Sequence, residues 1–226
     1  MLKLLSLSAN TLWAVLVKDA ACELRNKYAL TALIMFALIA LSCVSMTLNG
    51  AFLEPPLAAA LLWVVIFFAA MAGLARVFAA EQESGTLLAL RIYASSASVL
   101  GGKLIFNFIM LFGLTIFIAP LFLVLININN QVEWFSFTIT LFLGAAGLAA
   151  AATLTAAMVS CAEGKQTLFA VITFPLILPL LLSAVSATAL SLSGLRPDYT
   201  DILFLLGYDL ALIAVAVLLF DYLWYE

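Results

Sequence analysis

Histidine is absent from all 226 residues, and charged side chains make up only 9% of them. Without an imidazole, the chain lacks the usual general base and the commonest metal ligand in proteins. Soluble domains carry about 25% charged residues and are about half apolar, whereas this chain is 67% hydrophobic and has a mean hydropathy of +1.25. These shortages exclude a soluble globular protein and indicate an all-α integral membrane protein.

Cysteine is scarce as well, with only three residues, Cys22, Cys43 and Cys161. They form no CxxC pair and no spacing typical of a disulfide framework, so we interpret them as small packing residues. The sequence also lacks a Walker A lysine loop, a GxSxG motif and an HExxH zinc motif. We therefore expect no catalytic residue, no directly bound cofactor and no metal site, and any energy for work must come from a partner.

Long apolar runs dominate what is present. A membrane-spanning helix needs about 20 apolar residues, and six runs of the sequence meet this requirement. Residues 1–27 precede them and are mildly amphipathic, which predicts a helix lying flat in the headgroup layer. We expect a single membrane domain, 1–226, whose residues 28–220 hold six spans at about 28–48, 57–80, 104–126, 134–160, 167–190 and 202–220.

Basic residues lie almost entirely on one side of this arrangement. Four precede the first span, three lie from the last turn of span two to the start of span three, and Lys165 lies between spans four and five. Of the nine basic residues, Arg196 alone falls on the opposite side. Because cytoplasmic loops carry an excess of Lys and Arg, the sequence predicts that both termini and the stretch between spans two and three are cytoplasmic.

The stretch 76–103 interrupts the apolar runs with polar residues. In it, two glutamates come first, a Gly-Thr pair offers a turn and a helix cap, and leucines follow at roughly helical spacing. We interpret residues 81–100 as a short amphipathic helix on the membrane face that contacts a partner, and an ordinary connecting loop fits the pattern equally well. The candidate contact residues are Glu81, Glu83, Gly85, Thr86, Leu87, Leu88 and Leu90.

Three features lie inside the spans. Pro175 and Pro179 predict a bent or broken fifth span, because each removes a backbone hydrogen bond, and the bend serves either motion or static packing. Asp209 lies in the sixth span, where a carboxyl group is often functional, and a hydrogen-bonded packing role fits equally well. Small residues crowd the fourth span over 144–160, which predicts close helix packing.

The architecture and the central stretch resemble the type-2 ABC transporter permeases. The resemblance rests on the pattern E-x-E-x-G-T-L-x-x-L that begins at Glu81 and on the Gly-Lys pair before span three. Within this superfamily the chain is most similar to the CcmB family, haem exporter protein B of cytochrome c maturation. The stretches KDAACELRNK and LARVFAAEQESGTLLAL carry that similarity, as does P-L-x-x-P-L-L at 175–181. After Tyr93 the chain reads ASSASVLGGK, where the family commonly has a proline.

The resemblance implies that the central stretch docks as a coupling helix on a separate ATP-binding subunit, CcmA, with two copies of each subunit. It also implies a haem-handling membrane protein, CcmC, a small helper, CcmD, and the periplasmic haem chaperone CcmE, in the bacterial inner membrane. ATP would bind to the partner and haem would be handled by the complex. Any axial haem ligand would come from a partner, or weakly from Met71 or Met110.

Two other functions remain open from the sequence. A type-2 permease for a lipid-linked glycan or a drug would share the architecture, but larger outer loops or an extra domain would favour it. A non-transporting membrane scaffold for assembly is the alternative of a different class. No feature of the sequence predicts a nucleic-acid partner.

Overall fold

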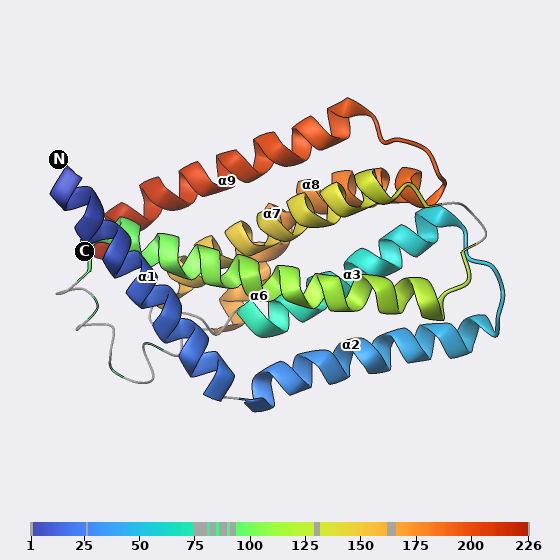
Figure 1. Ribbon diagram of the computed structural model, residues 1–226, viewed down its shortest axis with the longest axis horizontal. Coiled ribbons are helices and arrows are strands. Elements are labelled where there is room, and N and C mark those ends of the chain that lie inside the picture. The colour runs from blue at the N-terminus through green and yellow to red at the C-terminus, as the bar shows by residue number, and fades with distance from the viewer. Residues whose placement is uncertain are drawn as a thin grey trace.

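The computed structural model describes residues 2–25, 27–74, 81, 85, 90, 94–128, 132–161 and 166–225. Its regular structure is entirely helical, and these described residues contain no strand. Figure 1 shows an elongated helical bundle with the first helix crossing one of its ends. The helices are α1 (Leu2–Arg25), α2 (Lys27–Leu48), α3 (Pro55–Leu74), α6 (Ser96–Leu125), α7 (Trp134–Cys161), α8 (Gln166–Leu192) and α9 (Tyr199–Tyr225).

Six of the described helices, all except α1, are long and apolar enough to cross a membrane. This confirms the predicted six-span all-α membrane fold. In contrast, α1 lies obliquely across the end of the bundle (Figure 1) and has two unlike sides. Its Val15 is buried, whereas its Trp13 is 64% exposed. An indole exposed beside a buried apolar side is typical of a helix at the membrane interface.

The centre of the bundle is α7. In its spanning stretch 72% of the residues are buried, against 17% to 50% in the other five spans. Its small residues explain this position, because they let α3, α6, α8 and α9 approach its backbone closely. Gly144 lies against Trp63 of α3, and Gly147 lies against Leu180 of α8. The predicted close packing of this span is therefore confirmed.

Span three begins earlier than the apolar pattern predicts. The helix α6 starts at Ser96, and Ser95 is its N-cap, whose hydroxyl accepts a hydrogen bond from the Ser98 backbone N–H at 3.4 Å. The helix therefore starts about two turns before residue 104, where the apolar run of span three was expected to begin, because the polar residues before that run already continue the helix. Residues 96–100 of the predicted coupling element are thus the first turn and a half of α6.

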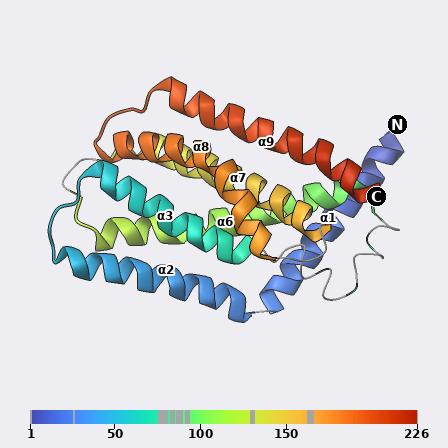
Figure 2. The same ribbon diagram turned by 180° about the vertical axis from the view of Figure 1, so that it is seen from behind.

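Both termini lie at the same end of the bundle, as Figures 1 and 2 show from opposite sides. At this end the Ser96 hydroxyl, at the start of α6, donates a hydrogen bond to the Asp221 carboxylate of α9 at 2.5 Å. The connections that follow α2, α6 and α8 lie at the other end (Figure 1). This arrangement agrees with the predicted topology. The assignment of the end with the two termini to the cytoplasm stays a prediction.

Candidate functional site

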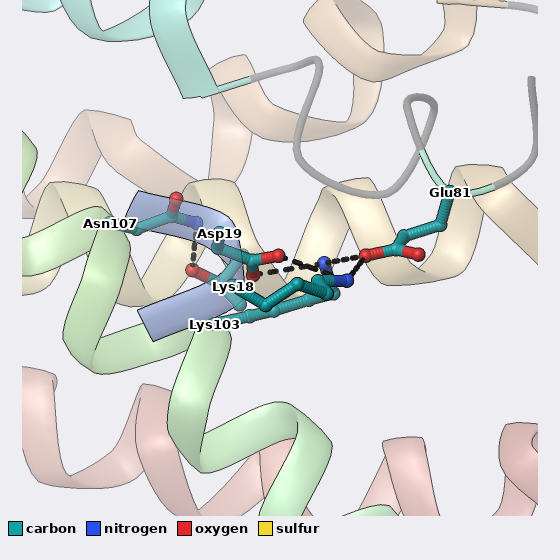
Figure 3. A network of polar contacts seen from close by, with 6 residues as sticks. Lys18, Asp19, Glu81, Lys103 and Asn107 are labelled. Carbon is teal, nitrogen blue, oxygen red and sulfur yellow. Dashed lines mark hydrogen bonds and ion pairs between the residues drawn. The ribbon is translucent and has the colours of Figure 1, made fainter. Parts of the chain in front are cut away.

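Four charged side chains meet at the end of the bundle that carries the termini (Figure 3). We call Lys18, Asp19, Glu81 and Lys103 the charge cluster. The Lys103 ammonium lies 3.2 Å from an Asp19 oxygen and 3.3 Å from a Glu81 oxygen. The Lys18 ammonium lies 3.2 Å from the other Asp19 oxygen and pairs with Glu81 as well. Each cation therefore contacts both anions.

The cluster joins three segments of the chain. Lys18 and Asp19 belong to α1, Lys103 belongs to α6, and Glu81 follows the end of α3 by seven residues. Lys103 is only 1% exposed, Glu81 5% and Asp19 9%. Charges so deeply buried are tolerated only when paired, and removing one partner of such a pair typically costs about 3–5 kcal/mol.

Lys18 is the outermost member of the cluster, with a side chain that is 37% exposed. Burial lowers the pKa of its ammonium group, but the hydrogen bond to Glu81 and the charges of Asp19 and Glu81 outweigh this. The pKa of Lys18 therefore lies above its ordinary value. The Lys18 ammonium thus stays charged over the whole physiological pH range.

Two glycines explain why α1 approaches α6 closely enough for the cluster to form. A β-carbon at Gly102 would lie 2.9 Å from Cγ1 of Val15 and 3.1 Å from the backbone oxygen of Leu12. A β-carbon at Gly101 would lie 3.1 Å from Cδ1 of Leu12. At Gly102 the backbone oxygen of Leu12 cannot easily move away, so glycine favours this close crossing, whereas at Gly101 the end of the Leu12 side chain could shift. The crossing sets Lys103 against Asp19.

A line of buried polar pairs continues from the cluster into the bundle. One turn beyond Lys103, Asn107 donates a hydrogen bond to the Thr153 hydroxyl of α7 at 2.7 Å (Figure 3). Near Thr153, the Thr173 hydroxyl of α8 donates to Thr155 of α7 at 2.8 Å. These bonds tie α6 to α7 and α7 to α8 in the same half of the bundle.

The predicted coupling element is described at only some of its candidate residues. Glu81 is in the charge cluster, and Gly85 is an exposed turn residue with a φ of +69° that favours glycine. Leu90 is partly buried against the apolar core. The other candidates, Glu83, Thr86, Leu87 and Leu88, lie outside the described residues, so the amphipathic character of the element stays a prediction.

The two prolines of span five lie inside α8, which continues as helix from Gln166 to Leu192 and is not broken at either of them. Between them, the carbonyl oxygen of Leu176 accepts a hydrogen bond from the Tyr208 hydroxyl of α9 at 2.8 Å. The carbonyl groups that Pro175 and Pro179 leave without a helical N–H partner are those of Val171 and Pro175, so this bond adds a contact between α8 and α9 at Leu176 and does not replace a bond that the prolines remove. The role of the prolines as a hinge stays a prediction.

Asp209 lies apart from the charge cluster. Asp221, which bonds Ser96 at the end of the bundle that carries the cluster, is twelve residues further along α9, about 18 Å in a helix. Asp209 itself faces Gly147 of α7 and Leu180 of α8. The residue is 5% exposed, and neither carboxylate oxygen has a hydrogen-bond partner among the described residues. The predicted orientation toward the bundle interior agrees with this burial, and its function stays a prediction.

Three members of the charge cluster, Lys18, Asp19 and Lys103, were not among the residues predicted as a site. Lys103 sits where an apolar span was already expected to begin, and a charged residue at such a place usually has a partner. That signal could have marked Lys103, but nothing local in the sequence identifies Asp19 as its partner.

The described residues contain no group of three or more Cys, Asp or Glu residues that could hold a metal ion. An apolar cavity of about 320 Å³ lies between α2, α3 and α6. Met110 lines this cavity, together with Gly73 and Gly113, whereas Met71 packs partly buried against the core.

Comparison with known proteins agrees with this architecture. The family model of the CcmB protein matches residues 10–222, from within α1 to the last turn of α9. No curated protein matches the chain. The match covers all six spans and every member of the charge cluster. The chain therefore belongs to the CcmB family, the membrane permeases of the ABC transporter for haem export in cytochrome c biogenesis.

Proposed function

We propose that this permease binds a separate CcmA-like ATPase through residues 81–100. ATP hydrolysis by that ATPase would drive haem delivery across the membrane. The recipient would be a periplasmic haem chaperone of the CcmE kind. CcmC-like and CcmD-like membrane proteins would complete the complex, and two copies of the permease would face two ATPase subunits in the bacterial inner membrane. Haem is the cargo of this complex, and ATP is bound by the partner.

The observation that carries the proposal is the anchoring of Glu81. The ion pairs with Lys18 and Lys103 hold Glu81, seven residues after the end of α3, at the end of the bundle that carries both termini. A fixed segment at this end can receive a push from a cytoplasmic subunit and pass it into the spans. In the sequence, the exposed turn at Gly85 shortly precedes the leucines that we propose as the apolar anchor.

The short connections at the other end support haem delivery over export of a lipid-linked glycan. They consist of residues 49–54, 126–133 and 193–198, which leaves no room for a folded outer domain. Since the chain has no histidine, a partner would supply the axial haem ligand. The permease would then provide the moving scaffold of the complex.

The test of ATPase docking is the double variant Leu87→Asp plus Leu90→Asp. A buried apolar anchor commonly contributes about 2 kcal/mol or more to binding, so its loss should weaken ATPase binding by more than roughly tenfold. The measurement is the yield of ATPase that co-purifies with the permease in detergent, with cytochrome c maturation scored in the same cells. A wild-type ATPase yield would overturn the docking proposal.

Two controls accompany this test. Leu195→Asp makes the same chemical change at a 58% exposed leucine in the connection between α8 and α9, and should leave ATPase binding unchanged. The single variant Leu87→Asp is measured alongside, because Leu90 packs partly against the core. Membrane insertion and thermal unfolding of each variant separate loss of docking from loss of folding.

A further inference from the structure

We propose that the charge cluster is a rigid joint. It holds α1, the segment beginning at Glu81 and α6 together, so that they move as one unit. In this role Glu81 is an internal positioning residue and not a contact for the ATPase. The inference rests on the proposed function, since it says how a push delivered to residues 81–100 reaches the spans. It adds α1 to the moving parts of the permease.

The first argument is the connectivity of the cluster. Asp19 contacts both lysines, and Glu81 contacts both lysines. Moving any one of the three segments away from the other two would therefore leave at least one ammonium or carboxylate group short of a partner. A single surface ion pair holds its partners weakly, whereas a network of this kind shares each charge among several contacts.

The second argument is burial. Lys103 is 1% exposed and Glu81 5% exposed, so water cannot replace a partner that moves away. A buried charge left alone is strongly unfavourable. This penalty keeps the cluster closed while a force acts on the segment at Glu81.

The third argument is the close packing of α1 against α6. Leu12 and Val15 of α1 lie so close to Gly101 and Gly102 of α6 that a β-carbon at either glycine would be in tight contact. Close packing transmits displacement, because the interiors of proteins are as dense as organic crystals. The hydrogen bond between Ser96 and Asp221 extends the connection from α6 to the end of α9.

The direct test measures the distance between α1 and α6 in the assembled permease–ATPase complex. One spin label is placed on the native Cys22, which is exposed on α1, and a second on Ile109→Cys, at a 56% exposed position of α6. Cys43→Ser and Cys161→Ser remove the other thiols, and dilution with unlabelled permease suppresses distances between copies. We expect the same distance without nucleotide and with a non-hydrolysable ATP analogue.

A change in this distance between the two nucleotide states would overturn the proposal, because α1 and α6 would then move independently. The measurement uses a chain with an intact cluster, so it remains decisive even where a cluster variant fails to fold. It also separates this inference from ATPase docking. Failure of docking appears as loss of the complex in the leucine variants, whereas failure of the joint appears as a changed distance within the complex.

The second test neutralises the cluster with the isosteric variants Asp19→Asn and Glu81→Gln. We expect the ATPase to co-purify within about twofold of wild type, while cytochrome c maturation falls by roughly fivefold or more, as for the loss of a typical coupling between sites. The matched control is Asp198→Asn, which neutralises an exposed carboxylate at the other end of the bundle. It should change neither measurement.

Two results of this second test would contradict the joint. If Glu81→Gln releases the ATPase as completely as the leucine double variant, Glu81 is a docking contact. If Asp19→Asn and Glu81→Gln both support maturation at the wild-type level, the cluster carries no coupling. A further readout is the spin-label distance in Asp19→Asn, which we expect to broaden and to depend on nucleotide.

Discussion

The indole ring of Trp63 lies directly over Gly144, so that a β-carbon at position 144 would lie 2.7 Å from Cζ2 of the ring and closer still to Cη2. The indole N–H donates a hydrogen bond to the Thr188 hydroxyl of α8 at 2.8 Å. Trp63 is only 1% exposed. One aromatic side chain of α3 is therefore fixed between α7 and α8, and the glycine is required for its position.

Gly144→Ala should destabilise the permease by about 1–3 kcal/mol, because the added methyl group overpacks a site with a rigid ring on one side. The matched control is Gly113→Ala, in α6, where a β-carbon would meet no atom within 4 Å. That variant should be neutral or slightly stabilising, since alanine favours the helix. Thermal unfolding in detergent checks both, and equal unfolding temperatures would contradict the packing argument.

Asp209→Asn should change the free energy of unfolding by less than about 1 kcal/mol, because no hydrogen bond is lost. The contrast is Thr153→Val, which removes the acceptor for buried Asn107 and should cost about 1–3 kcal/mol. Thermal unfolding of the two variants checks the difference. A large loss of stability in Asp209→Asn would show that the carboxyl group has a stabilising partner beyond the described residues.

The double variant Pro175→Ala plus Pro179→Ala tests the hinge. If the prolines serve motion, the variant should assemble with the ATPase and lose cytochrome c maturation, since restored N–H groups stiffen the helix. Tyr208→Phe is the companion variant, because it removes the hydrogen bond to Leu176 without changing the prolines. Maturation at the wild-type level in the proline variant would reduce the two residues to a packing role.

Raising the pH should weaken the contribution of Lys18 to stability. Its pKa in the folded protein lies above the ordinary value of 10.5, so the stabilisation is fully present below about pH 10.5 and is lost as the pH rises through the higher folded value. The measurement compares thermal unfolding of wild type and Lys18→Met between pH 8 and 11.5, both limits chosen to span roughly the lysine range. The two curves should converge at the alkaline end, and parallel curves would contradict the assignment.

Thiol labelling in intact cells tests the topology. Native Cys22 is exposed on α1, and we expect an impermeant reagent added from outside not to reach it. Glu54→Cys and Arg196→Cys, in the connections at the other end, should react, because the basic residues predict that this end is outside. Cys43→Ser and Cys161→Ser remove the other two thiols of the sequence. Labelling of Cys22 from outside would invert the orientation.

The sequence alone predicts the membrane fold because the information lies within each segment. A run of about 20 apolar residues must form a helix in lipid, where every backbone polar group needs a partner inside its own segment. The same holds for the interfacial helix α1 and for the small residues of α7. The apolar run of span three does not show the start of α6, because Gly101, Gly102 and Lys103 are polar or flexible in isolation and become helical interior only against α1.

The partners of Glu81 were decided by the tertiary structure. From the sequence Glu81 is a candidate contact with a partner, whereas in the structure it pairs with Lys18 and Lys103, 63 and 22 residues away. Asp19 and Lys103 meet across 84 residues. Periodicity shows which residues share a face of one helix, but only the packing of α1 over the glycines of α6 determines which faces meet. Because this packing buries the charged side chains, each of them needs a partner of opposite charge within the cluster.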